Sequence, residues 1–197
     1  EAHDLPPTMS DPVSTDVLVA GGGPAGLSAA LFTAKNGLGT IVLDTDATWM
    51  HKAHLFNYLG IESKDGTAFM EDAREQVAGF GADLRGEAAV TDAQKHEDHF
   101  HANTEEESYK AEYLVLATGA DRSLAEDLGC AFDDDVVDVD VTMETSVTDA
   151  YATGAMVRDQ EWQAIISAGD GAAAALNILT KEKGEHFHDF DTPADAE

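Results

Sequence analysis

The sequence predicts an α/β domain, with a parallel sheet covered by helices on one face and by a small antiparallel meander on the other. Two observations carry this prediction. An apolar run at 17–20 is followed at once by a glycine turn and a helix-like segment, and similar apolar runs recur at 40–43 and 112–117. Short continuous apolar runs are typical of strands buried on both faces of a parallel sheet.

The first apolar run leads into a turn suited to a dinucleotide phosphate. Gly21, Gly23 and Gly26 stand at G-x-G-x-x-G spacing. The first glycine allows a tight turn, the second lets a pyrophosphate touch the backbone, and the third lets the helix pack close to the strand. The expected helix, 25–35, would offer its unpaired N–H groups and positive dipole end to the phosphates.

Asp44 ends the second apolar strand. A carboxylate at this place in a βαβ unit accepts hydrogen bonds from a ribose diol. With strand, helix and acid all in place, the pattern predicts nucleotide binding. The alternative is a glycine-rich turn in an ordinary α/β domain.

The charge is strongly negative, with 39 acidic residues against 11 basic ones and a net charge of −28. Such an imbalance often signals disorder, but 43 % hydrophobic residues in regular periodicity predict a folded core. We interpret the charge as suited to molar salt, where the Debye length falls to about 3 Å. A salt-rich cytoplasm of haloarchaeal type is therefore expected. The same charge argues against binding nucleic acid or an anionic membrane.

Cysteine and histidine usage is uninformative about catalysis. Cys130 is the only cysteine, so neither an intrachain disulfide nor a C-x-x-C dithiol is possible. We interpret it as a buried apolar residue, because acidic neighbours disfavour a thiolate. The histidine tracts at 96–101 and 186–188 are interpreted as solvated surface, so no metal is expected. Neither a membrane span nor a signal peptide is expected, and a cytoplasmic location follows.

One domain is expected in residues 15–184, flanked by a flexible arm, 1–14, and a flexible tail, 185–197. Apolar residues at helical spacing predict a helix at 67–80 and an alanine-rich helix at 159–181. The other segments are shorter: an irregular stretch at 46–65, meander strands near 83–90, 99–102 and 108–110, and a strand at 150–154.

Several weaker motifs follow the glycine turn in a fixed order along the chain. They are N-Y-L-G at 57–60, Q-V-A-G-F-G-A-D at 76–83, L-A-T-G-A at 116–120, Y-A-T-G at 151–154, and Q-A-I at 163–165 with A-G-D-G-A at 168–172. Together they resemble the FAD domain of the low-molecular-weight thioredoxin reductases, over about residues 15–182. The resemblance implies an FAD/NAD(P)-binding Rossmann-like three-layer ββα domain, with FAD as the cofactor.

The resemblance also implies where FAD would be bound. The positions are the glycine turn, the ends of the strands, the loop before Asn57 and the start of the last helix. They comprise Gly21, Gly23, Pro24, Ala25, Gly26, Asp44, Lys52, His54, Asn57, Val90, Ala117, Thr118, Gly119, Gly154, Ala155, Trp162, Gln163 and Ala164. Asn57 would approach the isoalloxazine, and a cation among His51, Lys52 and His54 would stabilise reduced flavin. The alternative is that these three are solvated loop residues.

The chain also departs from this family. Only residues 121–146 stand where the family inserts an NADPH domain, and the redox C-x-x-C is absent. Ala155 replaces an aspartate that bonds FAD, and Trp162 replaces an arginine. Thioredoxin reductase activity is therefore not expected of this chain, and no catalytic residue is assigned. The short bridge at 121–146 is expected to leave the flavin face open.

The favoured function is a minimal FAD-dependent oxidoreductase that receives electrons from NAD(P)H or a redox partner protein. A homodimer is expected, with the second subunit covering the open flavin face. One alternative is a non-catalytic FAD- or nucleotide-binding redox sensor or complex subunit. Another is an NAD(P)-binding enzyme without flavin.

Overall fold

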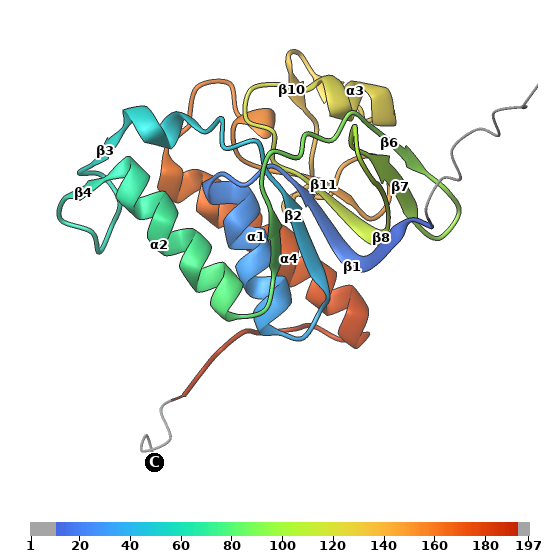
Figure 1. Cartoon of the computed structure of the whole chain (residues 1–197), viewed down its shortest axis with the longest axis horizontal. Helices are drawn as coiled ribbons and strands as arrows, with labels where there is room; N and C mark the ends of the chain where they lie inside the picture. Colours follow the sequence, from blue (N-terminus) through green and yellow to red (C-terminus); the bar gives the residue numbers. More distant parts are fainter. Residues whose placement is uncertain (1–10, 193–197) are drawn as a thin grey trace, which may run out of the picture.

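A computed structural model describes residues 11–192 of the chain. A seven-stranded sheet crosses the molecule, and five of its strands are parallel (Figure 1). The parallel strands lie in the order β5 (Asp83–Arg85), β2 (Thr40–Leu43), β1 (Val13–Ala20), β8 (Ser108–Leu116) and β11 (Ala150–Ala152). Within the described residues, no helix is both long and apolar enough to cross a bilayer.

Strand β8 belongs to two sub-sheets. One edge pairs in parallel with β1 along its length. On the other edge, 108–111 pair antiparallel with β7 (Phe100–Asn103), and 114–116 pair in parallel with β11. β6 (Asp92–Lys95) completes the meander by pairing with β7. The meander is therefore continuous with the parallel sheet through β8.

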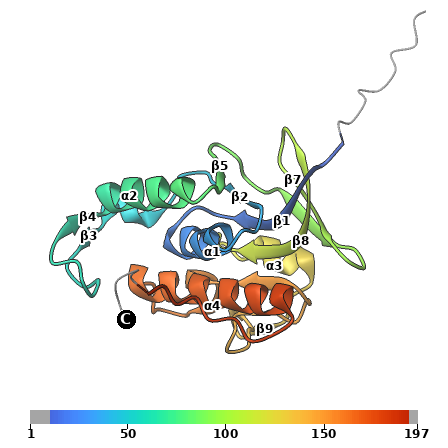
Figure 2. The ribbon, with the colours of Figure 1, turned by 90° about the horizontal axis from the view of Figure 1, so that it is seen from below.

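The three long helices lie on one face of the parallel sheet. Figure 2 shows α1 (Pro24–Lys35) between α2 (Gly66–Gly79) and α4 (Ala164–Lys183). In β1, Val17 and Val19 pack toward these helices, whereas Leu18 and Ala20 pack toward the meander and α3 (Ser123–Leu128). This alternation produces two apolar layers and confirms the expected fold class.

Helices α1 and α4 approach each other closely at Gly171. A Cβ at this position would collide with the carbonyl oxygen of Ala25 and press on the backbone nitrogen of Ala29. Gly154 has a φ of +68° and sits between Ala25 and Ser167. Small residues at these crossings let the backbone of α1 contact both α4 and the loop that precedes it.

Several element boundaries differ from expectation. β5, expected in the meander, instead pairs in parallel with β2, while β6 lies at residues that no pattern singled out. The two strands expected at 108–110 and 112–117 are one strand, β8. The parallel pairing of β1 with β8 extends to Val13, so β1 takes in the last two residues of the expected arm. Residues 1–10 and 193–197 of the expected arm and tail lie outside the described residues.

The last helix begins at Ala164, five residues later than expected. The indole N–H of Trp162 donates to the carbonyl of Arg158 at 3.1 Å, and the backbone N–H of Trp162 donates to Gln160 at 2.9 Å. These bonds form a turn, which leaves Gln163 as the N-cap of α4. Beyond the C-terminal end of α4, Asp189 and Asp191 form ion pairs with Lys35 of α1, so this part of the expected tail contacts α1.

Short elements fill the connections. They are the 3₁₀ turns η1 (Trp49–Lys52) and η2 (Gly154–Val157) and the hairpins β3 (His54–Leu55) with β4 (Lys64–Asp65) and β9 (Phe132–Asp133) with β10 (Val136–Val137). The bridge at 121–146 thus folds into α3 and the β9–β10 hairpin.

The tight crossing of α1 and α4 yields a stability prediction. Gly171→Ala is expected to lower the free energy of unfolding by about 1–3 kcal/mol, because its methyl group meets backbone that cannot yield locally. Gly169→Ala, in the same helix but with open space at the Cβ position, is expected to raise it by roughly 0.5–1 kcal/mol. Denaturant unfolding measures both; an equal gain in the two variants would contradict the proposed packing.

Candidate dinucleotide site

The carboxyl ends of four parallel strands meet at one edge of the sheet. Backbone hydrogen bonds join them: Gly21 donates to Leu43 at 2.8 Å, Ala117 donates to Ala20 at 2.8 Å, and Thr153 donates to Leu116 at 3.0 Å. Ligands of open α/β sheets bind outside this edge. The expected residues of the glycine turn, Asp44, Ala117–Gly119 and Gly154 all follow the ends of these strands.

Three glycines of the turn are required by the packing of the chain itself. Gly21 has a φ of +112°, and a Cβ there would collide with the carbonyl of Ala117. A Cβ at Gly22 would collide with the Asp44 carboxylate, and one at Gly26 with the carbonyl of Gly21. These positions fix the turn against the neighbouring strand ends and the start of α1.

Gly23 differs from its neighbours, because nothing in the chain requires it to be glycine. Its φ is −78°, and the nearest atom to a Cβ would be Thr48 Oγ1 at 3.7 Å. Gly23 is the N-cap of α1, so the space beside it borders the helix N-terminus. The absence of a side chain at Gly23 leaves room for a phosphate to approach the backbone. These residues therefore fit a dinucleotide pyrophosphate.

Two helix N-termini near this edge carry neither a side-chain cap nor an acidic first turn. They belong to α1, with N-cap Gly23 followed by Pro24, and to α4, with N-cap Gln163. Helix α2, in contrast, is capped by Asp65, which accepts hydrogen bonds from Thr67 and Ala68. In so acidic a chain, the two uncapped termini keep a positive dipole end available to an anion.

Asp44 is held in place by groups on three sides. Its Oδ1 accepts hydrogen bonds from the backbone N–H groups of Gly22, at 3.2 Å, and Asp46, at 2.9 Å. Its Oδ2 accepts one from Arg74 of α2, at 3.0 Å. A carboxylate has about four acceptor positions, so one remains for a ribose hydroxyl. The carboxylate is therefore oriented before any ligand arrives.

Arg74 was not singled out from the sequence. It also forms an ion pair with Asp46 and so ties the end of β2 to α2. It is the only basic residue of α2, which is a weak signal in the sequence. Only the packing of α2 beside β2 shows which carboxylates it contacts.

Arg122 connects the A-T-G strand end with the return segment. Its Nε donates to the carbonyl of Met156 at 3.0 Å, and its Nη2 donates to those of Ala155 at 2.9 Å and Arg158 at 3.2 Å. The carbonyls of η2 are thus bound by a side chain from the bridge at 121–146. The backbone at Ala155 is fixed even though the side chain there carries no polar group.

A second arginine anchors the same segment to α4. Arg158 makes a two-pronged contact with Asp170, through Nη2 to Oδ1 at 2.6 Å and Nε to Oδ2 at 3.2 Å. Asp170 is buried in the helix. This geometry is the strong form of an arginine–carboxylate pair. Arg122 and Arg158 together set the position of the loop that leads to Trp162 and Gln163.

Trp49 and Trp162 contact each other from opposite sides of the site. Their ring centroids are 5.1 Å apart at an interplanar angle of 61°. Trp49 follows β2 in η1, and Trp162 precedes α4, so this edge-to-face pair links the Asp44 side with the start of α4. Both rings remain largely exposed, at 62 % and 39 %. Trp49 was not anticipated from the sequence.

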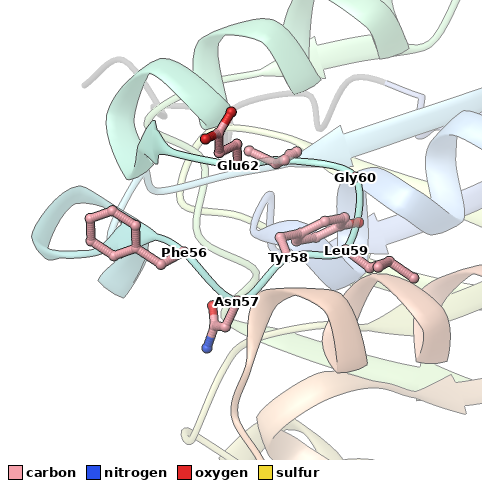
Figure 3. Close-up of a pocket in the computed structure, with 7 residues that line it drawn as sticks. Phe56, Asn57, Tyr58, Leu59, Gly60 and Glu62 are labelled. Atoms are coloured by element: carbon pink, nitrogen blue, oxygen red, sulfur yellow. The ribbon is translucent and has the colours of Figure 1, made fainter.

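Of the expected flavin contacts, Asn57 lies in the excursion between β3 and β4, and His54 lies in β3 at its start. Residues 56–62 line an open pocket of about 570 Å³, and Figure 3 shows Phe56 pointing to the opposite side from Tyr58. His54 bonds Ser63 at 2.9 Å, and its ring lies 4.5 Å from that of Phe56. Lys52 lies ahead of the excursion, in η1, and the flavin roles of Lys52, His54 and Asn57 stay predictions.

His51 is engaged by neighbouring side chains. Its ring nitrogens bond Asp46 at 2.7 Å and Thr67 at 2.9 Å. The hydrogen bond between His51 and Asp46, together with the contact from Arg74, lowers the pKa of Asp46. His51 is thereby oriented toward the end of β2 and the start of α2.

Val90 and Cys130 pack into the apolar layer beneath the meander. Val90 follows a segment that passes Asp44, where the N–H of Ala88 donates to the Asp44 carbonyl at 3.1 Å. Cys130 is buried, and burial raises the pKa of its thiol. Its environment therefore agrees with the structural interpretation.

Comparisons with known proteins agree with this geometry. The family model of the pyridine nucleotide-disulphide oxidoreductases matches residues 15–124 and 66–172. The thioredoxin reductase of Mycolicibacterium smegmatis is 30 % identical over 170 residues, covering 84 % of this chain and 51 % of that protein. The thioredoxin reductase of Treponema pallidum is 34 % identical over 116 residues, covering 54 % and 36 %. The chain thus spans between about a third and a half of these relatives.

Solved structures show the same fold. A thioredoxin reductase from Gloeobacter violaceus gives a TM-score of 0.81 at 20 % identity, with 93 % of this chain and 100 % of that chain covered. The thioredoxin reductase of T. acidophilum gives 0.80 at 18 % identity, covering 86 % and 99 %. The family model extends from β1 into α4 and takes in the glycine turn and the ends of β2, β8 and β11. The chain therefore belongs to the pyridine nucleotide-disulphide oxidoreductase family.

Proposed function

We propose that this chain binds FAD at the glycine turn and serves as a flavin-dependent oxidoreductase. The observation that carries the proposal is the space at Gly23, a glycine that the chain itself does not need, beside the uncapped N-terminus of α1. The family resemblance supports FAD over a nicotinamide dinucleotide at this position. The activity of the full-length relatives, their substrates and their partners are not carried over.

Each part of the dinucleotide has a matching group in the chain. Asp44, oriented by Gly22 and Arg74, accepts hydrogen bonds from the adenosine ribose. The N–H groups at the start of α1 bind the pyrophosphate, with no acidic residue there to repel it. Gln163 and Ala164, at the start of α4, take the ribityl end. When bound, FAD supplies hydride and electron transfer chemistry at its isoalloxazine ring.

The chain itself contributes binding, orientation and electrostatics. The Trp49–Trp162 pair links η1, on the Asp44 side of the site, with the segment that leads into α4. Lys52, His54 and Asn57 belong to the segment proposed to flank the isoalloxazine. Electrons come from NAD(P)H or from a redox partner protein. No side chain is assigned as nucleophile or general base.

The spectrum of the purified protein tests this function. We expect a yellow protein in molar KCl whose flavin absorbance bleaches with NADH, NADPH or a reduced redox protein. Bleaching by dithionite alone would favour the redox sensor or complex subunit instead. A colourless protein that releases a nicotinamide dinucleotide on denaturation would overturn FAD binding in favour of the nicotinamide alternative.

Gly23→Ala separates cofactor binding from stability. The added methyl group projects into the phosphate cradle but meets no protein atom closer than Thr48. We expect FAD affinity to fall at least about tenfold, which is about 1.4 kcal/mol, while the free energy of unfolding changes by less than about 1 kcal/mol. Fluorescence titration of the apoprotein measures the affinity, with Gly169→Ala as the control. Unchanged FAD affinity would place the pyrophosphate elsewhere.

Asp44→Asn and Asp46→Asn form a matched pair. Both carboxylates contact Arg74, but only Asp44 also binds the glycine turn. Loss of a charge-assisted hydrogen bond to the ribose is expected to weaken FAD binding about 10- to 100-fold for Asp44→Asn. Asp46→Asn should leave the affinity nearly unchanged. Equal losses in both variants would mean that Arg74, and not the ribose contact, sets the affinity.

We also propose that a second copy of the chain covers the flavin side in a salt-rich cell. Trp49, Phe56 and Leu59 leave large apolar side chains exposed in one segment of the chain. The net charge of −28 repels copies in dilute buffer and is screened in molar salt. Light scattering should show a dimer in about 2 M KCl and dissociation at about 0.1 M. A flavin-loaded monomer in molar KCl would refute the dimer.

A further inference from the structure

Three histidines gather at the β6–β7 hairpin. The N–H of His96 donates to the carbonyl of His99 at 2.8 Å, which places these two residues opposite each other across the turn. His99 immediately precedes β7, and His101 lies two residues further along, so an extended chain directs both side chains to the same face. Phe100 and Ala102 occupy the other face and are buried in the core. The three imidazoles therefore share the outer face of the hairpin.

The ring nitrogens of the three histidines converge. One nitrogen from each ring lies within 4.8 Å of the other two, and the ring centroids are 4.9–5.0 Å apart. Two imidazoles bound to one tetrahedral Zn²⁺ place their nitrogens roughly 3.3 Å apart, as follows from Zn–N bonds of about 2.0–2.1 Å. Small side-chain rotations on an exposed hairpin close this difference.

Asp98 prepares one of the ligands. Its Oδ1 lies 2.6 Å from Nδ1 of His99. A carboxylate on one ring nitrogen holds the proton there and leaves the other nitrogen, Nε2, free to bind a metal. This carboxylate–histidine arrangement is a recurring support of metal sites.

The charges around His101 act in two directions. Burial and the neighbouring rings of His96 and His99 lower the pKa of His101. Lys110 lies opposite His101 on β8 and also lowers this pKa. Its positive charge opposes a bound cation, whereas Asp98 and the strongly negative chain favour one.

We propose that His96, His99 and His101 bind one divalent transition-metal ion of the Zn²⁺ class, with a fourth position open to solvent. Imidazole ligands suit Zn²⁺, Cu²⁺ and Ni²⁺ and disfavour Mg²⁺ and Ca²⁺, which prefer oxygen. The site lies on the meander, whereas the glycine turn lies at the carboxyl ends of the parallel strands. This binding does not depend on the proposed flavin function. The sequence pattern alone predicts solvated surface here, and the convergence of the three rings is visible only in the fold.

Calorimetric titration of the chelator-treated full chain with Zn²⁺ tests the site. We expect one ion per chain, and affinity lowered at least about 100-fold in His99→Ala and in His101→Ala. Asp98→Asn should weaken binding about 10- to 100-fold, because the supporting carboxylate is lost. His54→Ala, a histidine outside the cluster, is the matched control. Excess Mg²⁺ should not compete, since it does not favour three imidazoles.

Two further measurements separate the site from adsorption of cations to the acidic surface. Co²⁺ bound in place of Zn²⁺ should give a visible ligand-field spectrum that is lost in the histidine variants. Zn²⁺ should also raise the unfolding temperature of the parent chain but not of His101→Ala, whose own fold is verified without metal. Equal Zn²⁺ affinity in the parent and in the two histidine variants, or full displacement by Mg²⁺, would overturn the proposal.

Discussion

The structure depends on the close approach of backbone to backbone at a few glycines. Gly21 touches the strand end at Ala117, Gly26 lets α1 start against Gly21, and Gly171 lets α4 cross α1 at Ala25. Each contact excludes any side chain. Together they fix the ends of β1 and β8 and the starts of α1 and α4 relative to one another. Gly23, beside them, is free of such contacts and leaves its space to a ligand.

Electrostatics complements this packing. In a chain with a net charge of −28, an anionic cofactor needs a place where carboxylates are absent or already engaged. The first turns of α1 and α4 carry no acidic residue, and Arg74 contacts both Asp44 and Asp46. Arg122 and Arg158 bind the return segment. Three of the 11 basic residues, Arg74, Arg122 and Arg158, thus bind carboxylates and carbonyls around the proposed site.

The bridge at 121–146 has a structural part in this frame. It contributes Arg122, which binds the carbonyls of η2, and it packs α3 and Cys130 beneath the sheet. Through these contacts the bridge holds the segment after β11 in place against the parallel sheet.

Local patterns determined the apolar cores of β1, β2, β8 and β11, the glycine turn, α1, α2 and the position of Asp44, because each depends on periodicity or spacing within a few residues. Tertiary structure decided the partners. The pairing of β5 with β2, the double role of β8 and the late start of α4 depend on contacts between distant segments. The contact of Arg74 with Asp44 and the convergence of His96, His99 and His101 also depend on the tertiary structure. Strand register and side-chain direction bring such groups together, and a linear sequence carries neither.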